Sequence, residues 1–581
     1  MPTTIEVNKQ SVEALLGSGK SKPFVIPEYQ RPYAWTDEQV ETLFEDLWDF
    51  TATSGGTERE SSYFLGSVVS YENEDGEQEI IDGQQRITSL FLLLRAIYTK
   101  LIATPASERT AEANNFIGKI EPTIWRTNKL TGMVDFKNIL LTSRVVNNEG
   151  NEILRSILET GKADEDAKDN YSKNYRHFQE LFDKHSTENP LMVYQFIYAL
   201  LNQAILLPIT ADTQDTALTI FSTLNDRGLP LSDADIFKAK IYNQLAPDDK
   251  KVFIDRWKDL DEQSTDANES IQQLFYYNMF YYRARDKDTK TTTPGVRKYY
   301  AVNKFERLYK PELLDTLFVI LNLWKVVNKG EELEDEAWSK NIKIRQTLDI
   351  LTSYPNEHWK YPVVIYYVCY RNEENFETRF ARFLNKLLME LMTKYLMIPT
   401  INAVKPDILK LNSAIVASDI PTFEFKTVDM TQLEPYIQNP NRNAVRMLLK
   451  TLAYEHQDDL LPAKWEIEHI FPQKWQTNYF PDEPDATIKE KIEHIGNKLP
   501  FEKKLNIVAG NGYFGKKKKE YTASEIVITK AMGTSDVMDW NLESITKRDI
   551  RVSDEVVKIM NRWNNEYLNI SISEGKMGEP S

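Results

Sequence analysis

The residue types best suited to chemistry lie close together between positions 466 and 519. Glu468 and His469 end a run of alternating apolar residues, which predicts a short strand that carries both side chains to a loop. An uncharged imidazole can take a proton from water near neutral pH, and a carboxylate and an amide oxygen are ligands that hard divalent cations prefer. With Asn506 as the amide, these residues predict hydrolysis of a phosphodiester by water.

The spacing of the neighbouring residues predicts the elements that carry this site. Pro472 ends the strand, Asn497 comes 28 positions after His469, and Asn506 comes nine positions after Asn497. Segment 501–505, directly before Asn506, is able to form a helix. We therefore expect the order strand, loop, second short element and helix.

A Glu-His pair is weak support for a site by itself, because a lone histidine is more often structural than catalytic. The chain contains three further pairs of this kind: Glu357-His358, Glu455-His456 and Glu493-His494. Neither His456 nor His494 ends an alternating strand or precedes a proline turn, so we expect both to be structural.

The strings EHIFP, IGN, LN and NGYFGKK resemble the C-terminal nuclease domain of GmrSD-type proteins, which are type IV, modification-dependent restriction enzymes. That domain is an HNH, or His-Me finger, nuclease with a ββα-metal fold. The resemblance implies that His469 is the general base, that Glu468 and Asn506 bind Mg²⁺ or another divalent cation, and that Asn497 holds the loop that bears His469. Asn511 and other nearby residues also match family positions.

One of these further matches, Lys517, lies in a run of four lysines, and its role is open. The family often has an apolar run after the GN dipeptide, whereas Lys498 and Pro500 interrupt that run in this chain. This departure from the family pattern affects the expected backbone conformation after Asn497 but not the identity of the proposed metal ligands.

A second group of polar residues lies at a predicted strand-to-helix turn and consists of Asp82, Gly83, Gln84, Gln85 and Arg86. A glycine there lets the backbone approach a ligand closely, and the first amides of a helix attract phosphate. Arg86 in the first helical turn is unfavourable unless it meets an anion. The two glutamine amides are candidates to orient a water molecule or a base edge. Such turns are abundant in α/β proteins, and most bind nothing.

The strings IPEYQRPYAW, YFLGSVV and IIDGQQRITSL are more specific, and together they resemble the N-terminal domain of the same family. That domain has a ParB/sulfiredoxin-like α/β fold and uses DGQQR to bind and hydrolyse a nucleotide. The resemblance implies that Asp82, Gln84, Gln85 and Arg86 handle a nucleoside triphosphate with Mg²⁺, with GTP favoured over ATP. Four residues match a family motif near that site and either belong to it or sense a DNA modification: Tyr29, Gln30, Arg31 and Pro32.

A third match is the string FSTLNDRGLPLSDADIFKAKIY, which places Asn225, Asp226, Arg227 and Gly228 at a turn. Gly228 suits a helix stop and Ser232 suits the cap of the next helix. On one interpretation Arg227 and Lys238 contact phosphate and Asp235 orients them. On the other, Asp226 and Asp235 only cap helices and Lys238 is exposed.

The net charge of −16 argues against a protein that coats nucleic acid over its whole surface, so DNA contact requires local basic tracks. One candidate track is 283–310, where tyrosines alternate with cations, and the other is the lysine run. Basic side chains contact phosphates and aromatic rings stack on exposed bases, although most charge runs are only solvated surface. The DNA-binding candidates are Lys516, Lys517, Lys518, Lys519, Arg297 and Lys298.

The whole chain limits the classes of protein that it can represent. A length of 581 residues predicts several domains, and a single cysteine, Cys369, excludes a disulfide framework and a Cys-rich zinc site. The opening residues match no export or lipidation pattern, so we expect a cytoplasmic protein. The longest apolar stretch, 191–210, includes polar residues and Pro208, which predicts a buried helix running into a strand and no membrane span.

We therefore expect an α+β multidomain protein. The predicted parts are a nucleotide-binding and sensing domain (1–245), a helical connector with possible DNA contact (246–438), a nuclease domain embedded in helices (439–570) and a disordered tail (571–581). Segment 104–189 is expected to be mostly helical. The expected partners are nucleotide and double-stranded DNA, modified phage or foreign DNA above all. Helical regions of this size pack either internally or across a homodimer.

Three functions fit these predictions. The first is a nucleotide-regulated, modification-dependent DNA endonuclease or nickase that acts in anti-phage defence. In the second, the N-terminal domain is a nucleotidase or phosphotransferase, and the nuclease fold only binds DNA. The third is a nucleotide-gated DNA-binding or toxin-like protein that hydrolyses nothing.

Overall fold

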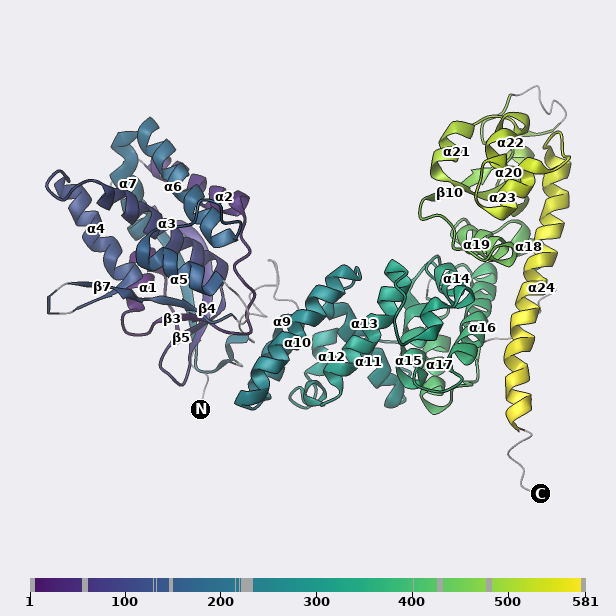
Figure 1. Ribbon diagram of the computed structural model, residues 1–581, viewed down its shortest axis with the longest axis horizontal. Coiled ribbons are helices and arrows are strands. Elements are labelled where there is room, and N and C mark those ends of the chain that lie inside the picture. Colours follow the sequence, from purple (N-terminus) through teal and green to yellow (C-terminus); the bar gives the residue numbers. More distant parts are fainter. Residues whose placement is uncertain are drawn as a thin grey trace, which may run out of the picture. The chain divides into compact units, whose positions relative to one another are not determined.

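A computed structural model describes residues 6–54, 61–128, 130–131, 133–145, 150–214, 216–218, 220, 233–400, 402–425, 432–476 and 483–575. The chain divides into two compact units, Met1–Lys258 and Asp259–Ser581, and the boundary falls within helix α10 (Pro247–Asp266) (Figure 1). Both units combine helices with small sheets, which agrees with the predicted α+β class. No described helix has the length and apolar character needed to cross a membrane.

The first unit is built around a seven-stranded sheet. Strand order along the sheet is β1-β9-β4-β5-β3-β8, and β2 also pairs with β9. The β4–β5 hairpin is antiparallel, whereas β4–β9, β3–β5 and β3–β8 are parallel. The strands are β1 (Glu6–Val7), β2 (Gln10–Ser11), β3 (Phe24–Ile26), β4 (Tyr63–Glu72), β5 (Gln78–Asp82), β8 (Leu141–Ser143) and β9 (Ala204–Ala211).

Helix α3 (Gln84–Ala103) follows β5 directly, as the sequence predicts, and residues 90–94 at its centre are completely buried. Its apolar side chains join those of the sheet and of the surrounding helices in one core. Helix α2 (Asp37–Ser54) is capped at its start, because the backbone nitrogen of Thr36 donates to Gln39 Oε1 at 2.8 Å. The other helices of this unit are α1 (Val12–Ser18), α2 (Asp37–Ser54), α4 (Ala111–Ile124), α5 (Gly150–Thr160), α6 (Asn170–Glu188), α7 (Val193–Tyr198) and α9 (Asp233–Gln244), with η1 (Pro190–Met192) and the π-helix η2 (Ala199–Gln203).

The segment 104–189 differs from its prediction. It contains three strands besides its helices: β6 (Trp125–Thr127) and β7 (Val134–Ile139), which pair with each other, and β8, which lies beside β3 in the main sheet. Most side chains of β7 are exposed, and apolar and polar residues alternate only over its first four positions, so its strand signal is short. The prediction for 191–210 is confirmed, because helical turns lead there into β9.

The second unit is mainly helical up to a two-stranded sheet, β10 (Trp465–His469) and β11 (Lys498–Glu502). Before the sheet lie α11 (Ile271–Arg285), α12 (Val296–Tyr300), η3 (Glu306–Tyr309), α13 (Leu313–Lys329), η4 (Ala337–Lys340), α14 (Ile342–Leu351), η5 (Glu357–Trp359), α15 (Lys360–Tyr370), α16 (Phe376–Met397), α17 (Lys405–Ala417), α18 (Glu434–Gln438) and α19 (Val445–His456). Between and after the two strands lie α20 (Asp485–Ile492), η7 (Ile495–Asn497), α21 (Lys503–Ala509), α22 (Phe514–Thr522), α23 (Val527–Thr534) and α24 (Leu542–Gly575).

The long helix α24, drawn in yellow in Figure 1, packs against α16 and α18 and also against the short turn η7 next to the sheet. It extends to Gly575, five residues into the segment that was predicted to be disordered. A second apolar core lies around the sheet and includes Phe471, Leu499, Phe501 and Phe514.

Candidate active site

The candidate active site is built on strands β10 and β11 and on helix α21, which packs against both of them. The strands are antiparallel, with Glu468 opposite Leu499 and His469 opposite Lys498. The predicted order of strand, loop, short element and helix is therefore present. One boundary was wrong, because Phe501 belongs to β11 and Asn506 lies within α21 rather than after it.

Strand β11 continues through Pro500, which lies opposite Ile467. A proline is tolerated here because each strand of a two-stranded sheet has an open edge, where no partner strand needs its missing N–H. The Pro500 carbonyl accepts a hydrogen bond from Thr529 Oγ1 at 2.5 Å. The residues that interrupt the expected apolar run thus leave the backbone of the site regular.

His469 is largely buried at the end of β10, and its Nε2 lies 3.5 Å from Glu493 Oε1. Burial lowers the pKa of His469 below its ordinary value of 6.5, and the charges of Lys498 and Lys517 lower it further, while Glu493 raises it. Glu493 is itself held by Lys498, whose Nζ lies 2.8 Å from its Oε2. The imidazole is therefore uncharged near neutral pH, as a general base must be.

Asn497 is completely buried and connects the segment that follows β10 to the segment that precedes β11. Its Nδ2 donates to the carbonyls of Phe471 and Ile492 at 3.0 and 3.1 Å, and its Oδ1 accepts from the backbone nitrogen of Phe471 at 2.7 Å. Its own carbonyl accepts from the nitrogen of Ile470 at 2.8 Å. These four bonds fix the loop that directly follows His469.

Glu468 lies beside His469 with 5% of its surface exposed, and its Oε1 is bound on two sides. Lys517 Nζ lies 2.8 Å from Oε1, and the Tyr521 hydroxyl donates to the same oxygen at 2.7 Å. Lys517 also donates to the His469 carbonyl. Burial lowers the pKa of Lys517, although the Glu468 charge acts in the opposite direction.

Each of the two predicted ligands has an oxygen of the kind that divalent cations bind. Within the described residues, neither Glu468 Oε2 nor the side chain of Asn506 forms a hydrogen bond, so each has an oxygen to offer. No described cluster of three or more His, Cys, Asp or Glu side chains is arranged to hold a metal. An ion at Glu468 and Asn506 would therefore complete its shell with water and phosphate oxygens, as Mg²⁺ commonly does.

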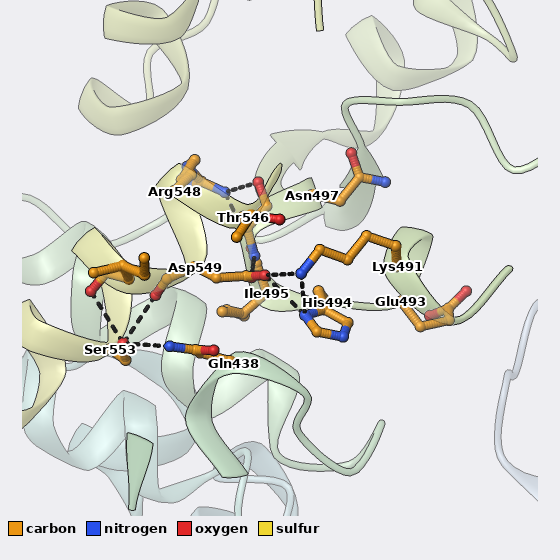
Figure 2. Close-up of polar contacts among 12 residues, drawn as sticks. Gln438, Lys491, Glu493, His494, Ile495, Asn497, Thr546, Arg548, Asp549 and Ser553 are labelled. Carbon is orange, nitrogen blue, oxygen red and sulfur yellow. Dashed lines mark hydrogen bonds and ion pairs between the residues drawn. The ribbon is translucent and has the colours of Figure 1, made fainter. Parts of the chain in front are cut away.

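Two buried residues of α24 support the site and were missed in the sequence, Arg548 and Asp549 (Figure 2). Arg548 Nη1 lies within hydrogen-bond distance of the carbonyls of Ile495, Gly496 and Lys498, at 3.0, 2.9 and 2.8 Å. Asp549 Oδ1 accepts from the nitrogen of Gly496 at 2.7 Å. A Cβ added at Gly496 would lie 2.3 Å from the Ile545 carbonyl, so only glycine permits this close contact.

The other oxygen of Asp549 holds a histidine and a lysine. His494 Nδ1 lies 2.8 Å from Asp549 Oδ2, and Lys491 Nζ lies 3.0 Å from it (Figure 2). His494 is therefore structural, as expected. In the sequence only the amphipathic pattern of α24 marks its buried face, and that pattern does not tell a buried ion pair from an exposed one.

The four lysines of α22, all predicted to contact DNA, have different surroundings. Lys517 is buried with Glu468, and Lys518 donates to the carbonyls of Ser535 and Val537. Lys516 and Lys519 are exposed. Successive residues of a helix point in different directions, so a run of four cannot form one surface track.

The aromatic residues of the track 283–310 mostly belong to the core. Tyr282, Tyr299 and Tyr300 are buried, so they cannot stack on bases in this structure. Arg283 is also buried, with its Nε 2.8 Å from Asp288 Oδ2. Of the two DNA-binding candidates in this track, Lys298 is exposed and Arg297 is half-buried.

The N-terminal candidate site lies where β5 passes into α3. Gly83 caps the helix with a φ of 87°, and no side chain caps the helix there, so its first amides are available to an anion. Arg86 Nη1 donates to the Ser67 carbonyl at 3.1 Å. Burial lowers the pKa of Arg86, which the Asp82 charge partly offsets, and burial raises the pKa of Asp82. The charges of Asp82 and Arg86 thus act on each other at this turn.

Gly66, on the neighbouring strand β4, leaves space for that guanidinium. Its φ is 115°, and an added Cβ would lie 2.9 Å from Arg86 Cζ. A glycine is therefore required both by the backbone and by the side chain packed over it. The YFLGSVV string contains this glycine, but its contact with Arg86 could not be read from the sequence.

The two glutamines of this turn have different surroundings. Gln85 Oε1 accepts from the nitrogen of Ala34 at 2.7 Å, and its Nε2 donates to the Pro32 carbonyl at 3.1 Å, so its amide holds the chain and is not free to orient a ligand. Gln84 is buried, and its Oε1 has no hydrogen-bond partner among the described residues. It faces a narrow space that Arg31 and Tyr33 also line.

The remaining sensing candidates are held against the same sheet. The Tyr29 hydroxyl donates to Glu79 Oε1 at 2.7 Å, and burial raises the pKa of Tyr29 well above its ordinary value. Gln30 Nε2 donates to the Ile81 carbonyl at 3.1 Å. Pro32, like Arg31, is exposed.

Arg31 also connects this motif to the third match. Its Nε lies 3.7 Å from Asp235 Oδ2, and Lys238 follows one turn later on α9. Asn225, Asp226, Arg227, Gly228 and Ser232 lie outside the described residues.

Both candidate sites fall within segments that match known families. Residues 12–242 match the family described as GmrSD restriction endonuclease, N-terminal domain, and residues 429–552 match GmrSD restriction endonucleases, C-terminal domain. The chain belongs to the GmrSD restriction endonucleases. DNA is therefore the substrate class of this GmrSD protein, and restriction cleavage is its activity. No curated protein matches the sequence significantly.

The two matched ranges of this GmrSD protein include most of the residues described above. The N-terminal match contains Asp82 to Arg86 together with Gly66, and the C-terminal match contains Glu468, His469 and the α24 pair Arg548 and Asp549. The helices between residues 243 and 428 lie outside both matches.

Proposed function

We propose that this protein is a nucleotide-regulated, modification-dependent DNA endonuclease or nickase of the HNH type that acts in anti-phage defence. The observation that carries the proposal is the arrangement of His469, a buried and uncharged histidine at the end of a strand, in a loop that Asn497 fixes with four hydrogen bonds. Hydrolysis of a phosphodiester needs a base held in one position beside the attacking water.

In this mechanism His469 removes a proton from water. Glu493 lies beside Nε2 and stabilises the tautomer that carries its proton there, which leaves Nδ1 as the accepting atom. The attacking oxygen then forms the bond to phosphorus while the bond from phosphorus to the departing deoxyribose oxygen breaks. Glu493 also stabilises the imidazolium that forms, and Lys498 keeps Glu493 in place.

Glu468 and Asn506 would hold the divalent cation. A bound Mg²⁺ supplies positive charge that stabilises the developing charge on the phosphate and on the departing oxygen. Lys517 and Tyr521 hold Glu468 by its Oε1, so Oε2 would be the oxygen that binds the ion.

The N-terminal unit would bind a nucleoside triphosphate, with GTP favoured, and would sense the modification. Support comes from the uncapped first turn of α3 and from the Arg86 guanidinium over Gly66, both of which suit phosphate. Gln84, with its unpaired buried oxygen, is the candidate to orient the attacking water.

The test is cleavage of three matched plasmids that are unmodified, glucosylated at hydroxymethylcytosine or phosphorothioated, each with Mg²⁺ and with GTP, ATP or neither. The proposal expects cleavage of one modified plasmid only, with a dependence on nucleotide that Arg86→Ala removes. Cleavage of all three plasmids alike would contradict modification dependence, and cleavage indifferent to nucleotide and to Arg86→Ala would contradict the regulatory role. Nucleotide turnover without any cleavage would favour a protein whose C-terminal domain only binds DNA.

A further inference from the structure

A cavity of about 770 Å³ lies in the second unit between helices α19, α23 and α24. This volume is within the range of sites that take small molecules, about 300–1,000 Å³. The cavity is separate from His469 and Glu468, and neither the family resemblance nor the proposed mechanism assigns it a role.

The inner wall of the cavity is apolar. Leu452, Met532, Trp540 and Val552 line it, and each of them is at most 8% exposed. At its mouth Val527 and Val537 remain 42% and 37% exposed, which is unfavourable for aliphatic side chains in water. An apolar body in the cavity would remove this surface from water.

The charged side chains around the cavity are mostly cationic. Arg551 is exposed at the lining and forms no ion pair or hydrogen bond with any other described residue. Arg548 and Lys547 line the same cavity, and Lys547 pairs with Glu543 on the surface. The one acidic lining residue, Glu555, is hydrogen bonded through its Oε1 to His456 Nε2 at 2.6 Å. The surplus of positive charge favours an anion.

Two lining residues also contain a buried nitrogen without an acceptor. Trp540 Nε1 and Arg548 Nε are buried and have no hydrogen-bond partner among the described residues. Buried N–H groups are nearly always paired, so each unpaired one here points to an acceptor that arrives with a ligand.

We propose that this cavity binds a small anionic amphiphile, with its apolar or aromatic body between α19 and α23 and its carboxylate or phosphate at Arg551. The opposite end of the Arg548 side chain is hydrogen bonded to the turn Ile495–Asn497, which positions the chain around His469 (Figure 2). An occupant would therefore contact a residue that holds the turn next to the loop of His469. An effect of the occupant on cleavage rests on the proposed function, whereas binding itself does not.

The test uses 8-anilinonaphthalene-1-sulfonate, an anionic aromatic dye, titrated into the full-length protein without DNA. Arg551→Glu should weaken binding of the dye at least tenfold. Lys558→Glu makes the same charge change on an exposed residue of α24 that does not line the cavity, and it should leave binding unchanged. Ala531→Trp, which fills the cavity from α23, should also abolish binding, while basal cleavage stays as in the wild type.

Competition separates the two sources of the anion. Displacement of the dye by decanoate indicates a carboxylate ligand, and displacement by a nucleoside monophosphate indicates a phosphate. Equal dye binding by the wild type, Arg551→Glu and Ala531→Trp would overturn the proposal, as would a dye that neither competitor displaces. A wild-type protein that binds the dye but cleaves no DNA would contradict the proposed function and leave the binding site established.

Discussion

Lys517 Nζ lies 2.8 Å from Glu468 Oε1, and both side chains are almost completely buried. The lysine was expected at the DNA surface, yet its charge lies inside the site and neutralises the carboxylate that would hold the metal. Removing one member of a buried ion pair leaves the other charge unpaired and costs about 3–5 kcal/mol.

Lys517→Met should therefore destabilise the protein by about 3–5 kcal/mol and also weaken its affinity for Mg²⁺, because Glu468 loses the partner that orients it. Chemical denaturation and isothermal titration with Mg²⁺ measure the two effects. Lys519→Met, on the same helix but exposed, is the matched control and should change the free energy of unfolding little. Equal stability of the two variants would contradict the buried ion pair.

The second prediction concerns Gly66. Gly66→Ala should reduce nucleotide binding and turnover strongly, because the new methyl group displaces the Arg86 guanidinium and the φ of 115° strains any other residue. Nucleotide binding is measured with a fluorescent GTP analogue. Gly118→Ala, inside α4 where a Cβ meets nothing, should instead stabilise the protein by about 0.5–1 kcal/mol and leave binding intact.

The third prediction is the pH dependence of cleavage. A histidine accepts a proton only when it is uncharged, so the rate falls as the pH drops through its pKa. Since the pKa of His469 is lowered, this fall should come below pH 6.5. Glu493→Gln removes a charge that raises this pKa and should move the fall to still lower pH, whereas Glu490→Gln on exposed α20 should not. The measurement is the single-turnover cleavage rate of each variant from pH 4.5 to 8. A fall at higher pH in Glu493→Gln than in the wild type would exclude His469 as the titrating group.

The fourth prediction separates the four lysines of α22. Lys516→Ala and Lys519→Ala should each weaken DNA binding about equally for all DNA sequences. Each should also reduce the slope of the logarithm of the binding constant against the logarithm of the salt concentration by about one. Lys518→Ala should leave that slope unchanged, because its ammonium is engaged with the carbonyls of Ser535 and Val537. Fluorescence anisotropy across a series of salt concentrations would show a drop in slope for Lys518→Ala if the assignment were wrong.

The sequence predicted the elements around both sites well where local signals are strong. The alternating residues before His469 and the glycine turn before Gln84 lie in the predicted strand and helix start. The predictions failed where contacts between distant parts of the chain determine the direction of a side chain or the formation of a strand. The lysine run does not reveal that Lys517 faces inward, and polar strands such as β7 form only because a partner strand is present.

Long-range contacts were also beyond prediction. Arg548 and Asp549 are hydrogen bonded to Gly496, which lies about fifty positions earlier in the chain, and no local sequence pattern predicts such a contact. The tyrosines of 283–310 show the same limit of the sequence. Tyrosines that alternate with cations fit an exposed surface that stacks on bases, but they also fit a core that arginine side chains cover.

The most direct test of the central claim compares the wild type, His469→Ala and His456→Ala in Mg²⁺-dependent cleavage of the modified plasmid. His456 belongs to another Glu-His pair and lies outside the candidate site, so its variant controls for general effects of losing a histidine. The account predicts that His469→Ala retains the fold and DNA binding but loses cleavage by at least a hundredfold, while His456→Ala cleaves as the wild type does. Cleavage by His469→Ala at the wild-type rate would contradict it.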